Sequence, residues 1–253
     1  VFAVGADGSL AAFAADNGDE LWRTRLPEPV KVGLGAGGDL LLAGGDGVVM
    51  AASKEDGGPR WQASVSSEVL APPVRSGGVV VVRTVDGGVY GLAADDGAEL
   101  WQFRLQVPLL TLRGNSAPVM SMDGRYAGAP GGSAPAAVDG GIIVGGDNGR
   151  LTALAAADGK QMWEQAVTAP RGRNDLERMV DIDGRLAVSG GLVFASSHQG
   201  RTVAIPPADG RLVWSRDVPS HAGCAEAGGT VYLSDDGGDL WALSGRNGAS
   251  LWR

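Results

Sequence analysis

Short apolar runs alternate with glycine turns along the whole chain. Runs such as Val80-Val81-Val82 and Val231-Tyr232-Leu233 are rich in β-branched or aromatic residues and are followed closely by glycines. β-Branched runs bounded by turn residues are typical of strands. The Ala-rich stretch 151–158 is cut by a turn glycine before it could form a long amphipathic helix. The pattern therefore predicts an all-β chain of short strands.

A tryptophan marks each period of this pattern. Six tryptophans recur with the period of the pattern; each stands four residues after a glycine, and an Asn or Asp precedes that glycine each time. These six are Trp22, Trp61, Trp101, Trp163, Trp214 and Trp252. A second glycine stands ten residues before the first in every unit. Asx-Gly pairs tolerate the positive φ angles of hairpin turns, so each unit contains two tight turns.

Each unit reads as four antiparallel strands. We expect strands on both sides of the earlier glycine, a third strand opened by the tryptophan, and a fourth ahead of the Gly-Gly pairs, as at 73–78. A small residue, such as Gly91, recurs four residues after the earlier glycine, and we expect two sheets to approach closely there. Units of about 40 residues with four strands predict the blades of a β-propeller, with a β-sandwich or solenoid as the alternative.

The length of the chain accommodates one such domain. At 253 residues and 44% apolar composition, we predict a single β-propeller domain over 1–253, with about six blades. Val1 already lies in a predicted strand, and Arg253 directly follows a tryptophan. We therefore expect a fragment of a longer propeller, truncated at both ends.

Composition narrows the classes of partner and chemistry. The net charge of −8 argues against nucleic acid or an anionic membrane as a partner. The only cysteine, Cys224, cannot form an internal disulfide. His198 and His221 lack the spacing of metal ligands, and we expect both to be ordinary surface or loop residues. Residues 145–149 have the register of a hairpin turn. We predict no catalytic residue, no metal site and no cofactor.

The period fails at two consecutive places, and function is expected there because insertions in repeat proteins form loops on one face. The intervals between successive repeat tryptophans are 39, 40, 62, 51 and 38 residues. The first insertion contains Leu110, Leu112 and Arg113. Its leucine side chains either plug the underside of the disc or form an exposed apolar patch for a partner. The second contains Asp181 and Asp183, which either belong to an ordinary solvated loop, pair with Arg113, or contact a partner.

The repeat and the two insertions together carry a family resemblance. The Asx-Gly-x-x-x-Trp element resembles the tryptophan-docking motif of quinoprotein-like propellers with eight blades. The segments 108–114 and 175–183 are similar to the corresponding loops of the BamB family, and the likeness extends over essentially the whole chain. A second Ser-Ala-Pro at 133–135 departs from the family pattern and leaves the geometry of the first insertion open.

This resemblance implies a function and a site. It implies a non-enzymatic scaffold of the β-barrel assembly machinery that binds the POTRA region of BamA and assists folding and insertion of outer-membrane proteins, with unfolded precursors as further partners. The implied contact residues are Leu110, Leu112, Arg113, Asp181 and Asp183. The implied location is the periplasmic face of the outer membrane, through a lipid anchor that this chain does not contain.

Two other functions share the repeat. The pyrroloquinoline-quinone dehydrogenases have the same docking element but use a Ca²⁺ site, a catalytic Asp and commonly a pair of adjacent cysteines, which one cysteine cannot provide. A periplasmic binding propeller with another protein partner is the third alternative. Fold alone does not choose among these functions, so the choice depends on the two insertions.

Overall fold

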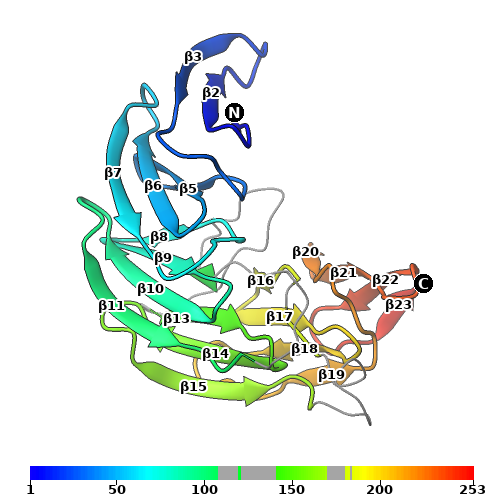
Figure 1. The fold of residues 1–253 in the computed structure, drawn as a ribbon. Coiled ribbons are helices and arrows are strands. Elements are labelled where there is room, and N and C mark those ends of the chain that lie inside the picture. Colours follow the sequence, from blue (N-terminus) through cyan, green and yellow to red (C-terminus); the bar gives the residue numbers. More distant parts are fainter. Residues whose placement is uncertain (108–118, 121–140, 170–179, 183) are drawn as a thin grey trace.

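In the computed structural model, the described residues form six antiparallel sheets that follow one another around an arc (Figure 1). The structure describes residues 1–107, 119–120, 141–169, 180–182 and 184–253. Sheet 1 has three strands and each of the other five has four. Every described pairing of neighbouring strands within a sheet is antiparallel and connects strands that are consecutive in the chain. This is the predicted all-β fold of propeller blades.

The strands of the first three sheets cover residues 2–104. Sheet 1 contains β1 (Phe2–Val4), β2 (Ser9–Phe13) and β3 (Glu20–Arg25). Sheet 2 contains β4 (Gly35–Gly37), β5 (Leu40–Gly44), β6 (Val48–Ser53) and β7 (Pro59–Ser64). Sheet 3 contains β8 (Val74–Ser76), β9 (Val79–Arg83), β10 (Gly88–Ala93) and β11 (Glu99–Arg104). The fourth strand expected at 73–78 is confirmed as β8, ahead of the Gly77-Gly78 turn.

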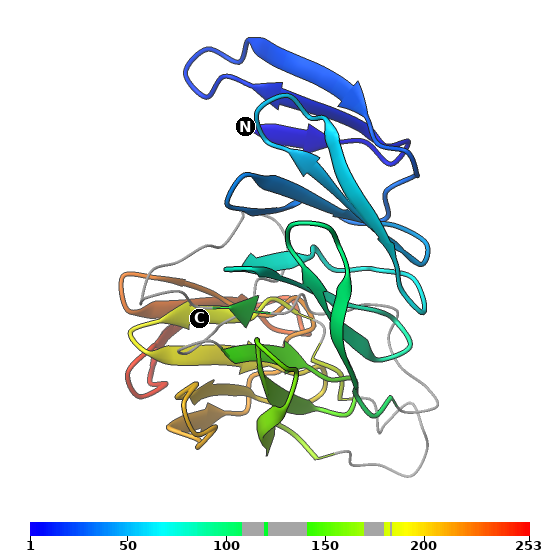
Figure 2. The same ribbon diagram turned by 90° about the vertical axis from the view of Figure 1, so that its left-hand side faces the viewer.

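The other three sheets repeat this order. Sheet 4 contains β12 (Val119–Met120), β13 (Gly141–Gly145), β14 (Arg150–Ala155) and β15 (Gln161–Ala166). Sheet 5 contains β16 (Ala187–Ser189), β17 (Leu192–Ser196), β18 (Thr202–Ile205) and β19 (Trp214–Arg216). Sheet 6 contains β20 (Ala225–Ala227), β21 (Thr230–Ser234), β22 (Leu240–Ser244) and β23 (Ser250–Trp252). Figure 2 shows the blue sheet 1 at one end of this series.

The hydrophobic core lies between successive sheets. One cluster joins Leu42 and Val49 of sheet 2 to Val80 and Val82 of sheet 3, and similar clusters fill the other four interfaces. The strands β9 and β13 are buried along most of their length because sheets cover both of their faces. This two-sided burial explains the continuous apolar runs in the sequence.

The repeat tryptophans join each sheet to the next. The Nε1 of Trp61 donates to the Ala94 carbonyl at 2.8 Å, and Trp22, Trp101, Trp163 and Trp214 make equivalent bonds. The Trp61 ring lies over Gly97 of the next sheet, where a Cβ would come within 2.6 Å of it. Gly97 also has a φ of +76°, so glycine is required both for the turn and for the close approach.

One detail of the predicted unit is different in the structure, and the small residue has a second role in addition to the predicted one. Except in sheet 5, the outer strand begins two residues before its tryptophan. The register of the strand pair shifts beside the tryptophan in these sheets, as between Ala12 and Phe13. The small residue faces the indole of its own sheet: a Cβ on Gly91 would lie 2.1 Å from the Trp101 ring. At this position the small size makes room for the tryptophan across the strand pair. The corresponding residues Ala51, Ala153 and Ala204 also lie in the clusters between successive sheets, as predicted.

Candidate functional site

The predicted site residues lie on the two long connections between sheets. Of the five, the structure describes only Asp181; Leu110, Leu112, Arg113 and Asp183 lie outside the described residues. The turn predicted at 145–149 is confirmed between β13 and β14. The described residues at the bases of the two connections show how the site is supported.

Both connections leave from the same edge of neighbouring sheets. The Leu105 N–H donates to the Gly87 carbonyl at 2.8 Å, and the Val167 N–H donates to the Gly149 carbonyl at 2.9 Å. The same bond joins Leu26 to Gly8 in sheet 1. We call this edge, which carries the turns between the second and third strands of each four-stranded sheet, the connection face. The two insertions therefore start on one face of sheets 3 and 4.

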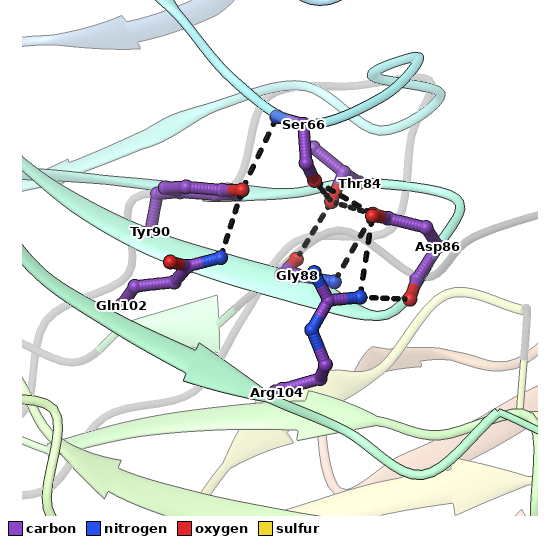
Figure 3. A network of polar contacts seen from close by, with 7 residues as sticks. All are labelled: Ser66, Thr84, Asp86, Gly88, Tyr90, Gln102 and Arg104. Carbon is purple, nitrogen blue, oxygen red and sulfur yellow. Dashed lines mark hydrogen bonds and ion pairs between the residues drawn. The ribbon is translucent and has the colours of Figure 1, made fainter.

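A polar network fixes the base of the first insertion (Figure 3). Asp86 accepts hydrogen bonds from the hydroxyls of Thr84 at 2.6 Å and Ser66 at 2.9 Å, and from Arg104 at 3.3 Å. The Tyr90 hydroxyl accepts from the Ser66 N–H at 3.1 Å and from the Gln102 amide at 2.9 Å. Because Ser66 follows β7, the network also links sheet 2 to sheet 3.

The electrostatics of this network stabilise a charged carboxylate. Partial burial raises the pKa of Asp86, but the hydrogen bonds from Thr84, Ser66, Gly88 and Arg104 outweigh it, so the pKa lies below its usual value. The carboxylate is therefore ionised at neutral pH and holds the turn before β10. That turn contacts Val107, since a Cβ on Gly87 would come within 2.4 Å of its side chain.

The end of the second insertion is packed between the turns of two sheets. Val180, Asp181 and Ile182 are 2%, 1% and 0% exposed. The Ile182 N–H donates to the Gly146 carbonyl of sheet 4 at 3.2 Å, and the His198 N–H of sheet 5 donates to the Asp181 carbonyl at 3.0 Å. Asp181 is therefore held inside the connection face, where its carboxylate is not exposed to solvent.

A buried ion pair joins the sheets that carry the two insertions. Arg83, at the end of β9, pairs with Asp147 in the turn between β13 and β14. Their side chains are 0% and 3% exposed. Sequence reasoning missed this pair, although an arginine directly after four valines was a usable signal. Asp147 gave no signal of its own, because Asx residues are common in every turn of this chain.

The two histidines meet at a single carboxylate, which sequence reasoning also missed. The Nδ1 atoms of His198 and His221 each lie 3.0 Å from an oxygen of Asp236. The N–H groups of Gln199 and His221 donate to the same carboxylate at 3.2 and 2.9 Å. Burial raises the pKa of Asp236, but these donors outweigh it and hold the pKa below its usual value.

The segment after Asp183 lies against sheet 6. A Cβ on Gly184 would come within 2.1 Å of the Gly223 nitrogen, so the two backbones are in direct contact. The Arg185 N–H donates to the Ala222 carbonyl at 3.2 Å, and the Cys224 N–H donates to the Arg185 carbonyl at 2.9 Å. The connection that leads into β20 of sheet 6 therefore supports the segment that follows the second insertion.

Within the described ranges, no group of three His, Cys, Asp or Glu side chains is placed to hold a metal ion. Burial raises the pKa of the Cys224 thiol to about 12, which leaves it protonated and unreactive at neutral pH. None of the described residues forms a helix long and apolar enough to cross a membrane.

Comparison with known proteins identifies the family. The family model described as "Outer membrane protein assembly factor BamB" matches residues 6–253. A protein of that name from Yersinia pestis is 32% identical over all of this chain, which spans 63% of the relative's length. The crystal structure of BamB from Moraxella catarrhalis matches 99% of this chain and 71% of its own, with a TM-score of 0.85 and 26% identity.

A more distant structure shares the fold alone. Quinohemoprotein alcohol dehydrogenase from Comamonas testosteroni matches 88% of this chain and 42% of its own, with a TM-score of 0.63 and 15% identity. Identity this low carries no information on function, whereas the family model matches nearly every residue of the chain. This chain belongs to the family of the outer membrane protein assembly factor BamB.

Proposed function

We propose that this chain is a non-enzymatic scaffold of the β-barrel assembly machinery and binds the POTRA region of BamA at the periplasmic face of the outer membrane. Membership of the BamB family supports the role in outer-membrane protein assembly. The observation that carries the proposed site is the common origin of the two insertions on the connection face of adjacent sheets. The proposed location includes the lipid anchor that the family resemblance implies.

The residues of the site divide into two roles. We assign direct contact with BamA to Leu110, Leu112, Arg113 and Asp183, because leucines bury apolar area and charged groups fix register by charge-assisted hydrogen bonds. Asp181 is 1% exposed and its carbonyl accepts from His198. We therefore assign Asp181 a supporting role inside the connection face, which changes the expectation that its carboxylate meets the partner.

The outer strands provide a second surface for protein partners. The outer strand of each sheet has one edge without a neighbour in its own sheet. Apolar side chains next to the repeat tryptophans are exposed there: Leu21 is 66%, Leu100 51% and Leu251 56% exposed. Unfolded outer-membrane protein precursors are the proposed ligands of these edges, because an extended chain can add a strand to a free sheet edge.

Arg113→Ala tests the BamA contact. We expect the affinity for the purified periplasmic region of BamA to fall by about tenfold or more, because a desolvated arginine at the centre of an interface is a common hot spot. Biolayer interferometry on both proteins would measure the dissociation constant.

The matched control is Arg150→Ala, which removes an exposed arginine paired with Glu164 at 2.8 Å in sheet 4. The affinity of this variant should stay within about twofold of the unchanged protein, as for a charge outside the interface. Unchanged binding by Arg113→Ala, with an intact circular dichroism spectrum, would remove the assigned contact.

Titration of the purified protein with pyrroloquinoline quinone and Ca²⁺ tests the dehydrogenase alternative. A dehydrogenase of this class would bind the quinone and show the absorbance of the bound form.

A further inference from the structure

The cluster of His198, His221 and Asp236 joins three segments of the connection face. His198 lies in the turn after β17, His221 in the connection from β19 to β20, and Asp236 in the turn after β21. The carboxylate of Asp236 faces both imidazole Nδ1 atoms, each at 3.0 Å. Its own N–H donates to the Pro219 carbonyl at 3.1 Å, which fixes the turn against the connection.

This cluster also fixes a strained turn. Gln199 has a φ of +50°, the one positive value at a non-glycine residue in the described part of the chain. Its N–H donates to Asp236 at 3.2 Å, and its side-chain amide lies 3.1 Å from the His198 Nε2. A left-handed conformation at a residue with a Cβ is unfavourable and persists where surrounding contacts hold it. Asp236 supplies one of these contacts from the neighbouring sheet.

The turn held in this way is the one that supports Asp181. The His198 N–H donates to the Asp181 carbonyl at 3.0 Å, so the position of 180–182 depends on the position of 197–199. The Ser220 N–H donates to the Ser197 carbonyl at 3.2 Å and adds a second link from the β19–β20 connection. A chain of contacts therefore runs from Asp236 in sheet 6, through His198 in sheet 5, to the second insertion.

We propose that Asp236 is a positioning residue for partner binding: it fixes His198 and His221 and, through His198, the segment at Asp181. The inference rests on the proposed function, because the positioned segment 180–182 directly precedes Asp183, one of the proposed BamA contacts. Asp236 makes no contact with the partner itself. Its effect on affinity is indirect, through the position of the buried segment at Asp181.

Asp236→Asn is the direct test because it keeps the size of the side chain and removes its charge and one acceptor oxygen. We expect the affinity for the periplasmic region of BamA to fall by about tenfold, the typical effect of losing hydrogen bonds to a charged group. Hydrogen exchange followed by mass spectrometry should accelerate in peptides covering 180–182 and 197–199, while exchange in sheets 1–3 stays unchanged.

Asp235→Asn is the matched control in the same turn. The Asp235 carboxylate accepts from the N–H groups of Gly237 and Asp239 and from the Trp241 indole at 2.8 Å, within sheet 6. The Asp235→Asn variant should bind BamA with an affinity within about twofold of the unchanged protein. Its hydrogen exchange at 180–182 should also stay unchanged, because hydrogen-bond losses confined to a turn act locally. Faster exchange throughout the molecule in Asp236→Asn would overturn the positioning role, because it would show a general loss of stability.

A pair of substitutions at His198 keeps the inference testable if Asp236→Asn folds poorly. His198→Asn keeps a polar side chain beside the Asp236 carboxylate, so binding should stay close to that of the unchanged protein. His198→Leu fills similar volume without a polar group there, and should lose about as much affinity as Asp236→Asn. Equal binding by both would overturn the inference. If the unchanged protein does not bind BamA, the proposed function fails, while hydrogen exchange at 180–182 still reports whether Asp236 holds that segment.

Discussion

At the scale of single residues, burial decides which polar groups can act. Asp181 and Arg83 have charged side chains that sequence patterns treat as solvated, yet they are 1% and 0% exposed. Both lie near insertions or turns of the connection face, where sheets cover them from two sides. Leu21, by contrast, is apolar and 66% exposed because it stands at a register shift of an outer strand. Neither outcome follows from the residue type.

Cys224 provides a prediction at this scale. Burial raises the pKa of its thiol to about 12, and its sulfur lies 3.3 Å from the Phe194 carbonyl. Because the thiolate is the reactive form, Cys224 should resist iodoacetamide at pH 8 and react fully in 6 M guanidinium chloride, about the concentration that unfolds even very stable proteins. Mass spectrometry would count the adducts, and rapid labelling of the folded protein would contradict the assigned burial.

At the scale of the element, the link between successive sheets is the repeat tryptophan. The tryptophan lies between an Asx-Gly turn in the next sheet and a small residue in its own sheet. This arrangement explains why the tryptophan, the Asx-Gly pair and the small residue recur together in each unit. The bonds from Trp61 and Trp101 to carbonyls of the next sheet are both 2.8 Å long. The regular spacing in the sequence is therefore the spacing of a contact between sheets.

Trp101→Phe tests this contact. The substitution removes the donor to the Ala156 carbonyl and leaves a smaller ring at a position that is 8% exposed. We expect the free energy of unfolding to fall by about 1–3 kcal/mol, because a buried carbonyl loses its donor and a cavity remains. Urea denaturation followed by circular dichroism would measure it.

The matched control is Trp252→Phe. The Trp252 ring is 48% exposed and contacts Tyr232, with 6.1 Å between ring centroids. Its replacement should change the free energy of unfolding by less than about 0.5 kcal/mol, as is usual for exposed positions. Equal losses in the two variants would show that docking on the next sheet is not the source of the stability.

At the scale of the whole molecule, the sheets act together through contacts between residues far apart in the chain. Arg83 and Asp147 are separated by 64 positions and join sheets 3 and 4 below the two insertions. Asp236 and His198 are separated by 38 positions and join sheets 5 and 6. These contacts lie on the connection face, so the same face carries the insertions and the polar groups that support them.

Asp147→Asn tests the buried pair. The change removes the negative charge that compensates the buried Arg83 guanidinium. We therefore expect the free energy of unfolding to fall by about 3 kcal/mol. The control Glu164→Gln disrupts the exposed pair with Arg150 and should lower it by less than about 1 kcal/mol. Comparing the urea midpoints of both variants would check the difference. A loss no larger than that of the control would contradict the role assigned to Asp147.

The sequence by itself determined the repeat, and with it most of the fold. Strand positions, hairpin turns and the docking tryptophans depend on local pattern: residues within one unit of about 40 positions choose a strand or a turn. The same local reasoning located the two insertions, because a broken period is visible without coordinates. From the family resemblance we then predicted which residues of those insertions belong to a partner contact.

Only the tertiary structure decided which distant groups meet. Nothing in the spacing of His198, His221 and Asp236 predicts that one carboxylate faces both imidazoles, since the three residues belong to turns and connections of two sheets. The same is true of Arg83 with Asp147 and of the burial of Asp181. Side-chain pairing between sheets depends on how the sheets pack, and packing is set by the whole chain and not by any one period.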